Sequence, residues 1–342
     1  MALSKGSKAF LAVVAAGVLL ISGYLVASSS VAAPQEVAEG PVQIEVPEGA
    51  TADQVGQLLA DAGLIRSTLA FKLLAQVDGR ASQIRAGSYE IQPGMDAEQI
   101  LAVLSQGPPE AETYKVAIPE GLTVEQTLER LAAAEGSGLT LEELREALSA
   151  IALPAWVPLD TLPEGAEPFE GLLFPATYDF VVGADPQQVL ARLVEQTETV
   201  MTEITPAPGM DRYQTLIVAS LIEREARIRD EQPVISAVIH NRLELPMRLQ
   251  IDATVLYALG GHKDRVTFED LEVDSPWNTY AVDGLPPTPI SGAGRSAIDA
   301  AAAPADAEYL YYVVINPETG EHGFSTTLEE HNQLKAEAQA AG

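Results

Sequence analysis

The hydrophobic and polar positions repeat a strand-to-helix unit in the first part of the chain. The segment Ile44–Gln54 reads IEVPEGATADQ and returns at Val116–Gln126 as VAIPEGLTVEQ, with a looser copy, YEIQPGMDAEQ, at Tyr89–Gln99. In each copy, alternating apolar residues predict a strand, and Pro and Gly predict a turn. Thr or Asp followed three residues later by Gln predicts a capping box that begins a helix.

The middle of the chain alternates helical and irregular segments. Residues 122–150 have apolar spacing typical of two helices, and residues 151–167 are rich in Pro and acidic side chains, as loops are. Residues 170–178 form an apolar run that predicts a strand broken by Pro175. Residues 185–202 predict a further helix. Together these segments predict an α+β fold.

One segment near the N-terminus predicts a membrane anchor. Ala9–Ala27 carries no charged residue, and its length as a helix is about 28 Å, close to the thickness of a bilayer core. Lys5 and Lys8 precede it, and the next basic residue is Arg66. The positive-inside rule therefore places the N-terminus in the cytoplasm and the chain after about residue 30 outside.

A cleaved signal peptide is the alternative for this segment. Ser28–Ala33 supplies the small residues that a signal peptidase needs. The apolar run is longer than a signal core of about 7–15 residues, and Pro34 directly follows the candidate cleavage site. We therefore expect an uncleaved anchor, and a mature N-terminus near Pro34 in mass spectrometry would show cleavage instead.

Composition narrows the classes of partner and chemistry. The 342 residues include 20 Lys and Arg against 49 Asp and Glu, a formal net charge of −29, which argues against nucleic acid and anionic lipid surfaces. A hydrophobic content of 47% supports packed domains, and the absence of Cys excludes disulfides, thiolate metal sites and Cys nucleophiles. The four His lack metal-ligand spacing, and no P-loop or Gly-x-Ser-x-Gly motif occurs, so no metal or cofactor is predicted.

The repeated units also divide the part outside the membrane. Gly107-Pro108-Pro109 marks a boundary. The part before it resembles LysM-type modules, which bind glycans that contain N-acetylglucosamine; a small α/β packing module without a ligand is the alternative. The predicted organisation is a cytoplasmic N-terminus, a single transmembrane helix, a linker, a LysM-like α/β module and a mixed α+β domain, at residues 1–8, 9–27, 28–40, 41–108 and 109–342.

The candidate chemistry begins at the end of a buried helix. Residues 213–227 predict a helix, and Leu216–Ile222 has no polar face, which is typical of a helix buried all round. Glu223 follows directly and shares a face with Ala219 and Ser220. Burial disfavours a charged carboxylate, so we expect a raised pKa, which a general acid needs near neutral pH.

A surface role is the alternative for the same residues. Glu223 with Arg227, and Glu225 with Arg229, have the i,i+4 spacing of helix ion pairs, and periodicity alone favours that common arrangement. Because Glu225 is two residues from Glu223, it cannot share the same helix face and should have a different role.

Polar and aromatic residues then accumulate on segments up to residue 332. Amides, hydroxyls and aromatic rings interleaved on loops suit a groove that binds sugars, although any single one is more often a loop cap or a core aromatic. They occur in HNRL at 240–243, MRLQIDATVLY at 247–257, SPWNTY at 275–280, DGLPPTPI at 283–290, GFS at 323–325 and EHN at 330–332.

These blocks resemble the endolytic murein transglycosylases of the YceG-like family. The resemblance rests on ASLIERE at 219–225, NRL at 241–243, MRLQID at 247–252, NTY at 278–280, GLPP at 284–287, HGFS and EHN within 322–332, and EGLLFPATY at 170–178. It extends over the whole chain, from the anchor through the LysM-like part to the catalytic region. Two departures are Trp277, where an aromatic such as Tyr is usual, and Thr288, where Gly is frequent.

The resemblance implies a reaction and its residues. The family cleaves the β-1,4 bond between N-acetylmuramic acid and N-acetylglucosamine in peptidoglycan, without water. Its glutamate falls on Glu223, which would protonate the glycosidic oxygen and then act as a base while the muramoyl C6 hydroxyl attacks, leaving a 1,6-anhydro end. Because the substrate supplies the nucleophile, a second carboxylate is not needed. The residues expected to position or support the substrate, from their places in the motifs, are Gln250, Asn278, Tyr280, Asp252 and Glu225.

We therefore expect a lytic transglycosylase anchored in a bacterial cytoplasmic membrane, with its YceG-like catalytic domain at 109–342 on the outer side. A linker of about 13 residues spans at most ~45 Å, which favours terminating or trimming nascent strands near the membrane. Cell-wall synthases are candidate partners. Two alternatives stay open: a hydrolase that recruits Asp252 or Glu225 as its second carboxylate and leaves reducing ends, and a non-catalytic scaffold that binds peptidoglycan.

Overall fold

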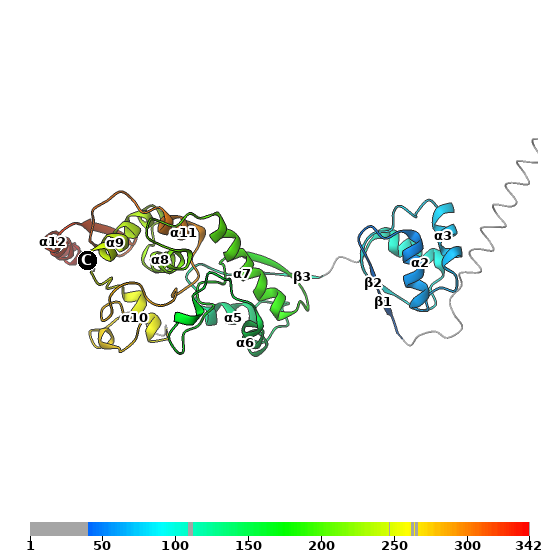
Figure 1. Cartoon of the computed structure of the whole chain (residues 1–342), viewed down its shortest axis with the longest axis horizontal. Coiled ribbons are helices and arrows are strands. Elements are labelled where there is room, and N and C mark those ends of the chain that lie inside the picture. The colour runs from blue at the N-terminus through cyan, green and yellow to red at the C-terminus, as the bar shows by residue number, and fades with distance from the viewer. Residues whose placement is uncertain (1–39, 109–111, 246, 261–262, 264–265, 342) are drawn as a thin grey trace, which may run out of the picture. The chain divides into compact units, whose positions relative to one another are not determined.

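Figure 1 shows the computed structural model, which describes residues 40–108, 112–245, 247–260, 263 and 266–341. The described residues form an α+β structure with eleven α-helices and three separate two-stranded antiparallel sheets. They belong to two compact units, divided between Ala111 and Glu112. The predicted anchor Ala9–Ala27 lies outside the described residues, and no described helix is long and apolar enough to cross a membrane.

The first unit packs three helices against one strand pair. Its elements are β1 (Val42–Val46), α2 (Ala52–Asp61), α3 (Thr68–Val77), β2 (Gly87–Ile91) and α4 (Ala97–Gln106). The two strands pair antiparallel with Ile44 opposite Tyr89, and both side chains are buried. The predicted capping boxes are present, with Thr51 beginning α2 and Asp96 beginning α4. The pattern of residues 44–54 and 89–99 is thus confirmed as two strand-to-helix units of one core.

The second unit contains eight helices and two strand pairs within the described residues. Its elements are β3 (Thr113–Ala117), α5 (Val124–Ala132), α6 (Leu141–Ala150), β4 (Thr177–Val181), α7 (Pro186–Glu203), α8 (Arg212–Glu225), α9 (Gln232–Glu244), α10 (Asp252–Ala258), α11 (Arg295–Ala302), β5 (Tyr311–Asn316), β6 (Glu321–Ser325) and α12 (Leu328–Ala341). Three short 3₁₀ turns lie at Leu159–Thr161, Arg229–Glu231 and Asp270–Glu272.

The central element of the second unit is α8, which contacts α9, α10 and α11 (Figure 1). Its residues from Thr215 to Ile222 are all buried, as the lack of a polar face predicts. Ser220, in this run, has its Oγ bonded to the backbone N–H of Ile290 at 3.0 Å. This bond ties the loop before α11 to the last turns of α8, where Glu223 lies.

Two elements differ from the sequence-based prediction. The strand expected at residues 170–178 begins only at Thr177, where β4 pairs with β3. Gly171 has a positive φ of 79°, and the preceding apolar residues are buried in a turn, because an apolar run alone does not distinguish a strand from a buried loop. The helix expected at 213–227 ends at Glu225, after which Ala226 is extended.

Candidate active site

Glu223 lies in the last turn of α8 and is half-buried. Its Oε2 accepts a hydrogen bond of 3.0 Å from the backbone N–H of Gly294, the residue that begins α11. Burial raises the pKa of the Glu223 carboxyl, and the Gly294 hydrogen bond opposes that rise because it stabilises the charged form. The raised pKa expected from the sequence is therefore confirmed, together with its cause.

Glu120 is a second carboxylate beside Glu223. A side chain at Gly294 would collide with the Glu120 carboxylate, so both carboxylates lie against the same glycine. The negative charge of Glu120 raises the pKa of Glu223, whereas Arg229 and Arg224 lower it. Arg229 also forms an ion pair of 3.5 Å with Glu120. The pKa of Glu223 thus depends on a local balance between one acidic and two basic side chains.

Glu225 occupies a different environment, as its spacing from Glu223 predicts. Its Oε2 accepts a hydrogen bond of 2.9 Å from the hydroxyl of Tyr312, on β5. Burial is the main cause of its raised pKa, and the nearby charge of Asp252 adds to it. Asp252 in turn accepts a hydrogen bond of 2.6 Å from Tyr280. Three of the predicted site residues, Glu225, Asp252 and Tyr280, therefore belong to one cluster.

The i,i+4 ion pairs that periodicity favours are not what the structure contains. Arg227 donates to the backbone oxygen of Pro317, and Arg229 pairs with Glu120. Glu223 and Glu225 are bonded instead to Gly294 and Tyr312. The two glutamates are therefore partly buried groups with specific partners rather than exposed helix pairs.

The structure places Gln250 at the surface and Asn278 in the interior. Gln250 is exposed, and its N–H donates to the backbone oxygen of Thr279. Its φ is +52°, and no other described residue except glycine has a positive φ. A non-glycine residue in this region stores strain, which is frequent at functional sites. Asn278 is fully buried: its amide donates to Leu271 and Val273, both at 2.9 Å, and its Oδ1 accepts from Tyr280 N–H. Asn278 thus holds the loop that carries Tyr280.

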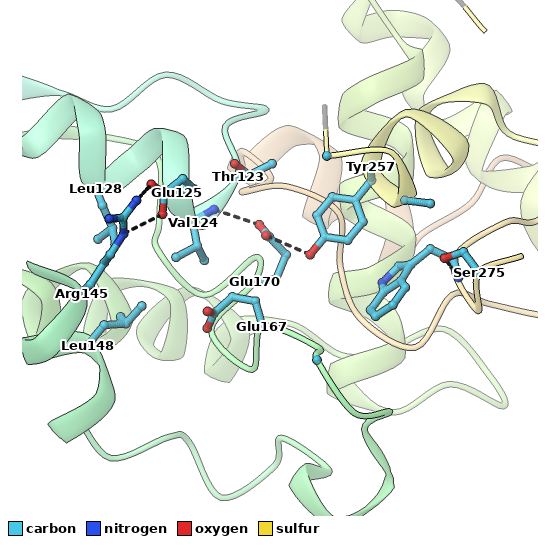
Figure 2. A pocket seen from close by; sticks show the side chains of 14 residues that line it. Thr123, Val124, Glu125, Leu128, Arg145, Leu148, Glu167, Glu170, Tyr257 and Ser275 are labelled. Atoms are coloured by element: carbon cyan, nitrogen blue, oxygen red, sulfur yellow. Dashed lines mark hydrogen bonds and ion pairs between the residues drawn. The ribbon is translucent and has the colours of Figure 1, made fainter. Parts of the chain in front are cut away.

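A separate hollow of about 610 Å³ lies between α5 and α6 on one side and α10 on the other (Figure 2). Glu170, only 3% exposed, lines it and accepts hydrogen bonds from the N–H of Val124 at 3.2 Å and from the hydroxyl of Tyr257 at 3.1 Å. Burial raises the pKa of Glu170 to about 8. None of the predicted site residues lines this hollow.

The described residues hold no cluster of three or more His, Cys, Asp or Glu side chains that could bind a metal ion. The polar groups at the candidate site are carboxyl groups, tyrosine hydroxyls and a backbone N–H group.

Comparison with known proteins places the chain in a family. The sequence model of the YceG-like family matches residues 44–337, which is most of the chain. The chain belongs to the YceG-like family. Within the family, an endolytic murein transglycosylase of Bacillus subtilis (strain 168) is 33% identical over 338 residues, covering 93% of this chain and 90% of that protein.

Two further relatives extend the family comparison. An endolytic murein transglycosylase of Streptococcus pneumoniae (strain R6) is 27% identical over 327 residues, covering 86% of this chain and 58% of that protein. The 2.6 Å crystal structure of a YceG-like protein from Listeria monocytogenes is 35% identical, with a TM-score of 0.55, and covers 87% of this chain and all of that one. The relationship to this family that the sequence blocks indicate is therefore confirmed.

Sequence reasoning missed two groups in this member of the YceG-like family. Glu120 lies in the repeated strand-to-helix unit, where the motif PEG was interpreted only as a turn, as at Glu48 of the first copy. Glu170 opens the apolar run that was interpreted as a strand. At Glu170 the sequence offered one signal, a charged residue at the start of an apolar run, because such residues are rarely buried without a partner. No comparable signal marks Glu120, since only the fold places it beside Glu223.

Proposed function

We propose that this chain is an endolytic lytic transglycosylase that cleaves peptidoglycan strands between N-acetylmuramic acid and N-acetylglucosamine. Membership of the YceG-like family and relatives named endolytic murein transglycosylases support the reaction class. The observation that carries the assignment of the acid is Glu223: a half-buried carboxyl with a raised pKa, held at 3.0 Å by the N–H of Gly294.

Glu223 would act twice in one turnover. Its protonated carboxyl donates a proton to the glycosidic oxygen as the bond from that oxygen to the anomeric carbon breaks. The resulting carboxylate takes the proton of the C6 hydroxyl of the same muramoyl residue while that oxygen bonds to the anomeric carbon, which closes the 1,6-anhydro ring. The Gly294 N–H stabilises the carboxylate between the two transfers.

The remaining predicted residues would align the muramoyl C6 oxygen with the anomeric carbon. An internal nucleophile is effective only in the correct orientation, so positioning replaces a second catalytic carboxylate. The exposed, strained Gln250 and the bonded pair Tyr280 and Asp252 are candidates for direct contact with sugar hydroxyls. Asn278 would act through the loop that it fixes, and Glu225 through its hydrogen bond with Tyr312.

The place of action is part of the same proposal. The uncharged segment Ala9–Ala27, preceded by Lys5 and Lys8, supports a single-pass anchor in the cytoplasmic membrane with the site on the outer side. The first unit would then be the LysM-like module that binds glycan. Both assignments rest on the sequence patterns.

A hydrolase is the second candidate because Glu120 lies beside Glu223. Water-using glycosidases pair two carboxyl groups across the scissile bond, and Glu120 fits that description better than Asp252 or Glu225 because its charge acts on Glu223 and both carboxylates lie against Gly294. Glu120 also forms an ion pair of 3.5 Å with Arg229. The two candidates differ in their products.

Mass spectrometry of the products tests both candidates. Peptidoglycan is digested with the purified chain, with Glu223→Gln, and with Glu129→Gln as a matched control at an exposed position of α5. We expect 1,6-anhydro ends from the wild type and the control, and a rate lower by about 10²–10⁴-fold for Glu223→Gln. Reducing ends from the wild type would establish the hydrolase, and unchanged anhydro products from Glu223→Gln would remove Glu223 as the acid.

A further inference from the structure

The hollow between α5, α6 and α10 has one aromatic wall that is held rigidly. The rings of Tyr257 and Trp277 lie 5.8 Å apart at 52°, and both line the hollow. Trp277 donates from its indole N–H to the hydroxyl of Thr288 at 2.8 Å, and the fully buried Thr288 donates to Pro289. Trp277 and Thr288, the two departures from the family pattern, are therefore bonded to each other, and the bond fixes the indole ring.

The rest of the lining is polar and includes three glutamates and one arginine. Glu125 is neutralised by its ion pair with Arg145, and both line the hollow. Glu170 has a pKa of about 8, so its carboxyl is mostly protonated at neutral pH, and burial also raises the pKa of Glu167. Figure 2 shows Glu167 and Glu170 between the α5 side and Tyr257. Polar side chains beside an aromatic wall suit a ligand that has both hydroxyl groups and an apolar face.

A short segment joins this hollow to Glu223. Glu120 lies beside Glu223, while Thr123 and Val124 line the hollow, and three residues of extended chain span at most ~11 Å. Paired bonds of 2.8 Å, between Gly121 and Gly292 and between Gly292 and Leu122, fix this segment next to Gly294. The hollow is therefore close enough to Glu223 for one oligosaccharide to reach both.

We propose that this hollow is a carbohydrate subsite, which holds a hexosamine ring of the glycan strand against Trp277 and Tyr257 while the strand crosses Glu223. The ring's apolar face would pack on the indole, and its hydroxyl and acetamido groups would bond to Glu167. The subsite rests on the proposed action on glycan, and it gives Trp277, Tyr257 and Glu167, which are not among the predicted site residues, a role in affinity.

Tryptophan fluorescence reports directly on this subsite. The chain contains two tryptophans, Trp156 and Trp277, and Trp156 does not line the hollow. The full chain carrying Trp156→Phe and Glu223→Gln therefore has one reporter and does not consume a glycan. A titration with a tetramer of N-acetylglucosamine should give a saturable change in Trp277 emission. Binding in the first unit produces no signal because that unit has no tryptophan.

A kinetic comparison of variants completes the test. In the chain with an intact Glu223, Trp277→Ala and the milder Trp277→Phe should raise KM for peptidoglycan, by about tenfold for Ala, with kcat within about twofold. Phe268→Ala is the matched control, since Phe268 is 92% exposed and lines no described hollow. Trp277→Phe keeps the assay informative if the Ala variant folds poorly.

The outcomes separate the subsite from the proposed reaction. A flat fluorescence titration, or an emission change with a lysine-containing peptide and none with the sugar tetramer, would overturn the carbohydrate subsite. Unchanged KM for both Trp277 variants in an active enzyme would also overturn it. A saturable titration, together with a wild-type chain that cleaves no peptidoglycan, would contradict the proposed reaction while supporting the subsite.

Discussion

At the scale of single residues, the pKa of Glu223 is the quantity on which its chemistry depends. Removing the negative charge in Glu120→Gln should lower that pKa, and removing the positive charge in Arg229→Gln should raise it. A general acid works in its protonated form, so activity declines as pH rises through the pKa of Glu223. The alkaline limb of the pH–rate profile should therefore move to lower pH in Glu120→Gln and to higher pH in Arg229→Gln, each by up to about 1 pH unit.

A general loss of structure would not move the pH–rate profile in opposite directions in two neighbouring variants. Glu129→Gln serves as the control for charge, and the shifts should diminish in ~1 M salt because the Arg229 side chain is 70% exposed. Shifts in the same direction, or none, would show that Glu120 and Arg229 do not set the pKa of Glu223. Complete loss of activity in Glu120→Gln together with reducing-end products in the wild type would support the hydrolase.

At the scale of elements, the important contact joins α8 to the loop before α11. Ser220→Ala leaves the buried N–H of Ile290 without its partner, so it should reduce the free energy of unfolding by about 1–3 kcal/mol. The loop that carries the Gly294 N–H would also lose its tie, which should lower kcat. Ser236→Ala is the matched control, because Ser236 is equally buried and its hydroxyl has no partner among the described residues.

Urea unfolding followed by tryptophan fluorescence measures this difference, since both tryptophans lie in the second unit. The control should unfold within about 0.5 kcal/mol of the wild type. Equal destabilisation by Ser220→Ala and Ser236→Ala would show that the bond to Ile290 contributes nothing specific.

The sequence predicts elements well where the signal is local. Capping boxes at Thr51, Asp96 and Thr123 all begin helices, because the side chains that satisfy the first helical N–H groups lie within one turn. The buried character of α8, and with it the raised pKa of Glu223, also follows from periodicity. The prediction of a strand at residues 170–176 was wrong, because a strand needs a partner strand that can be distant in the sequence. Only the part from Thr177 onward has such a partner, which is β3.

At the scale of the whole molecule, the parts of the site that the sequence did not reveal are those assembled from distant segments. Glu120 and Glu223 are 103 residues apart in the sequence, and Tyr257 and Glu170 are 87 residues apart. Motif order indicated which blocks to expect at the site. It could not show that Asn278 is buried in its loop, or that Trp277, which lines the hollow, is bonded to the buried Thr288.

The two units have separate hydrophobic cores, which predicts separable stability. Phe71 is fully buried in the first core, so Phe71→Ala should destabilise that unit by about 3–5 kcal/mol, whereas Leu73→Ala on the same helix, at a side chain 46% exposed, should have little effect. Circular dichroism follows both units, and tryptophan fluorescence follows only the second. In Phe71→Ala, part of the dichroism change should move to lower urea while the fluorescence midpoint stays in place. A matching shift in the fluorescence midpoint would mean that the two units unfold together. The proposed activity of Glu223 would then depend on the stability of the first unit.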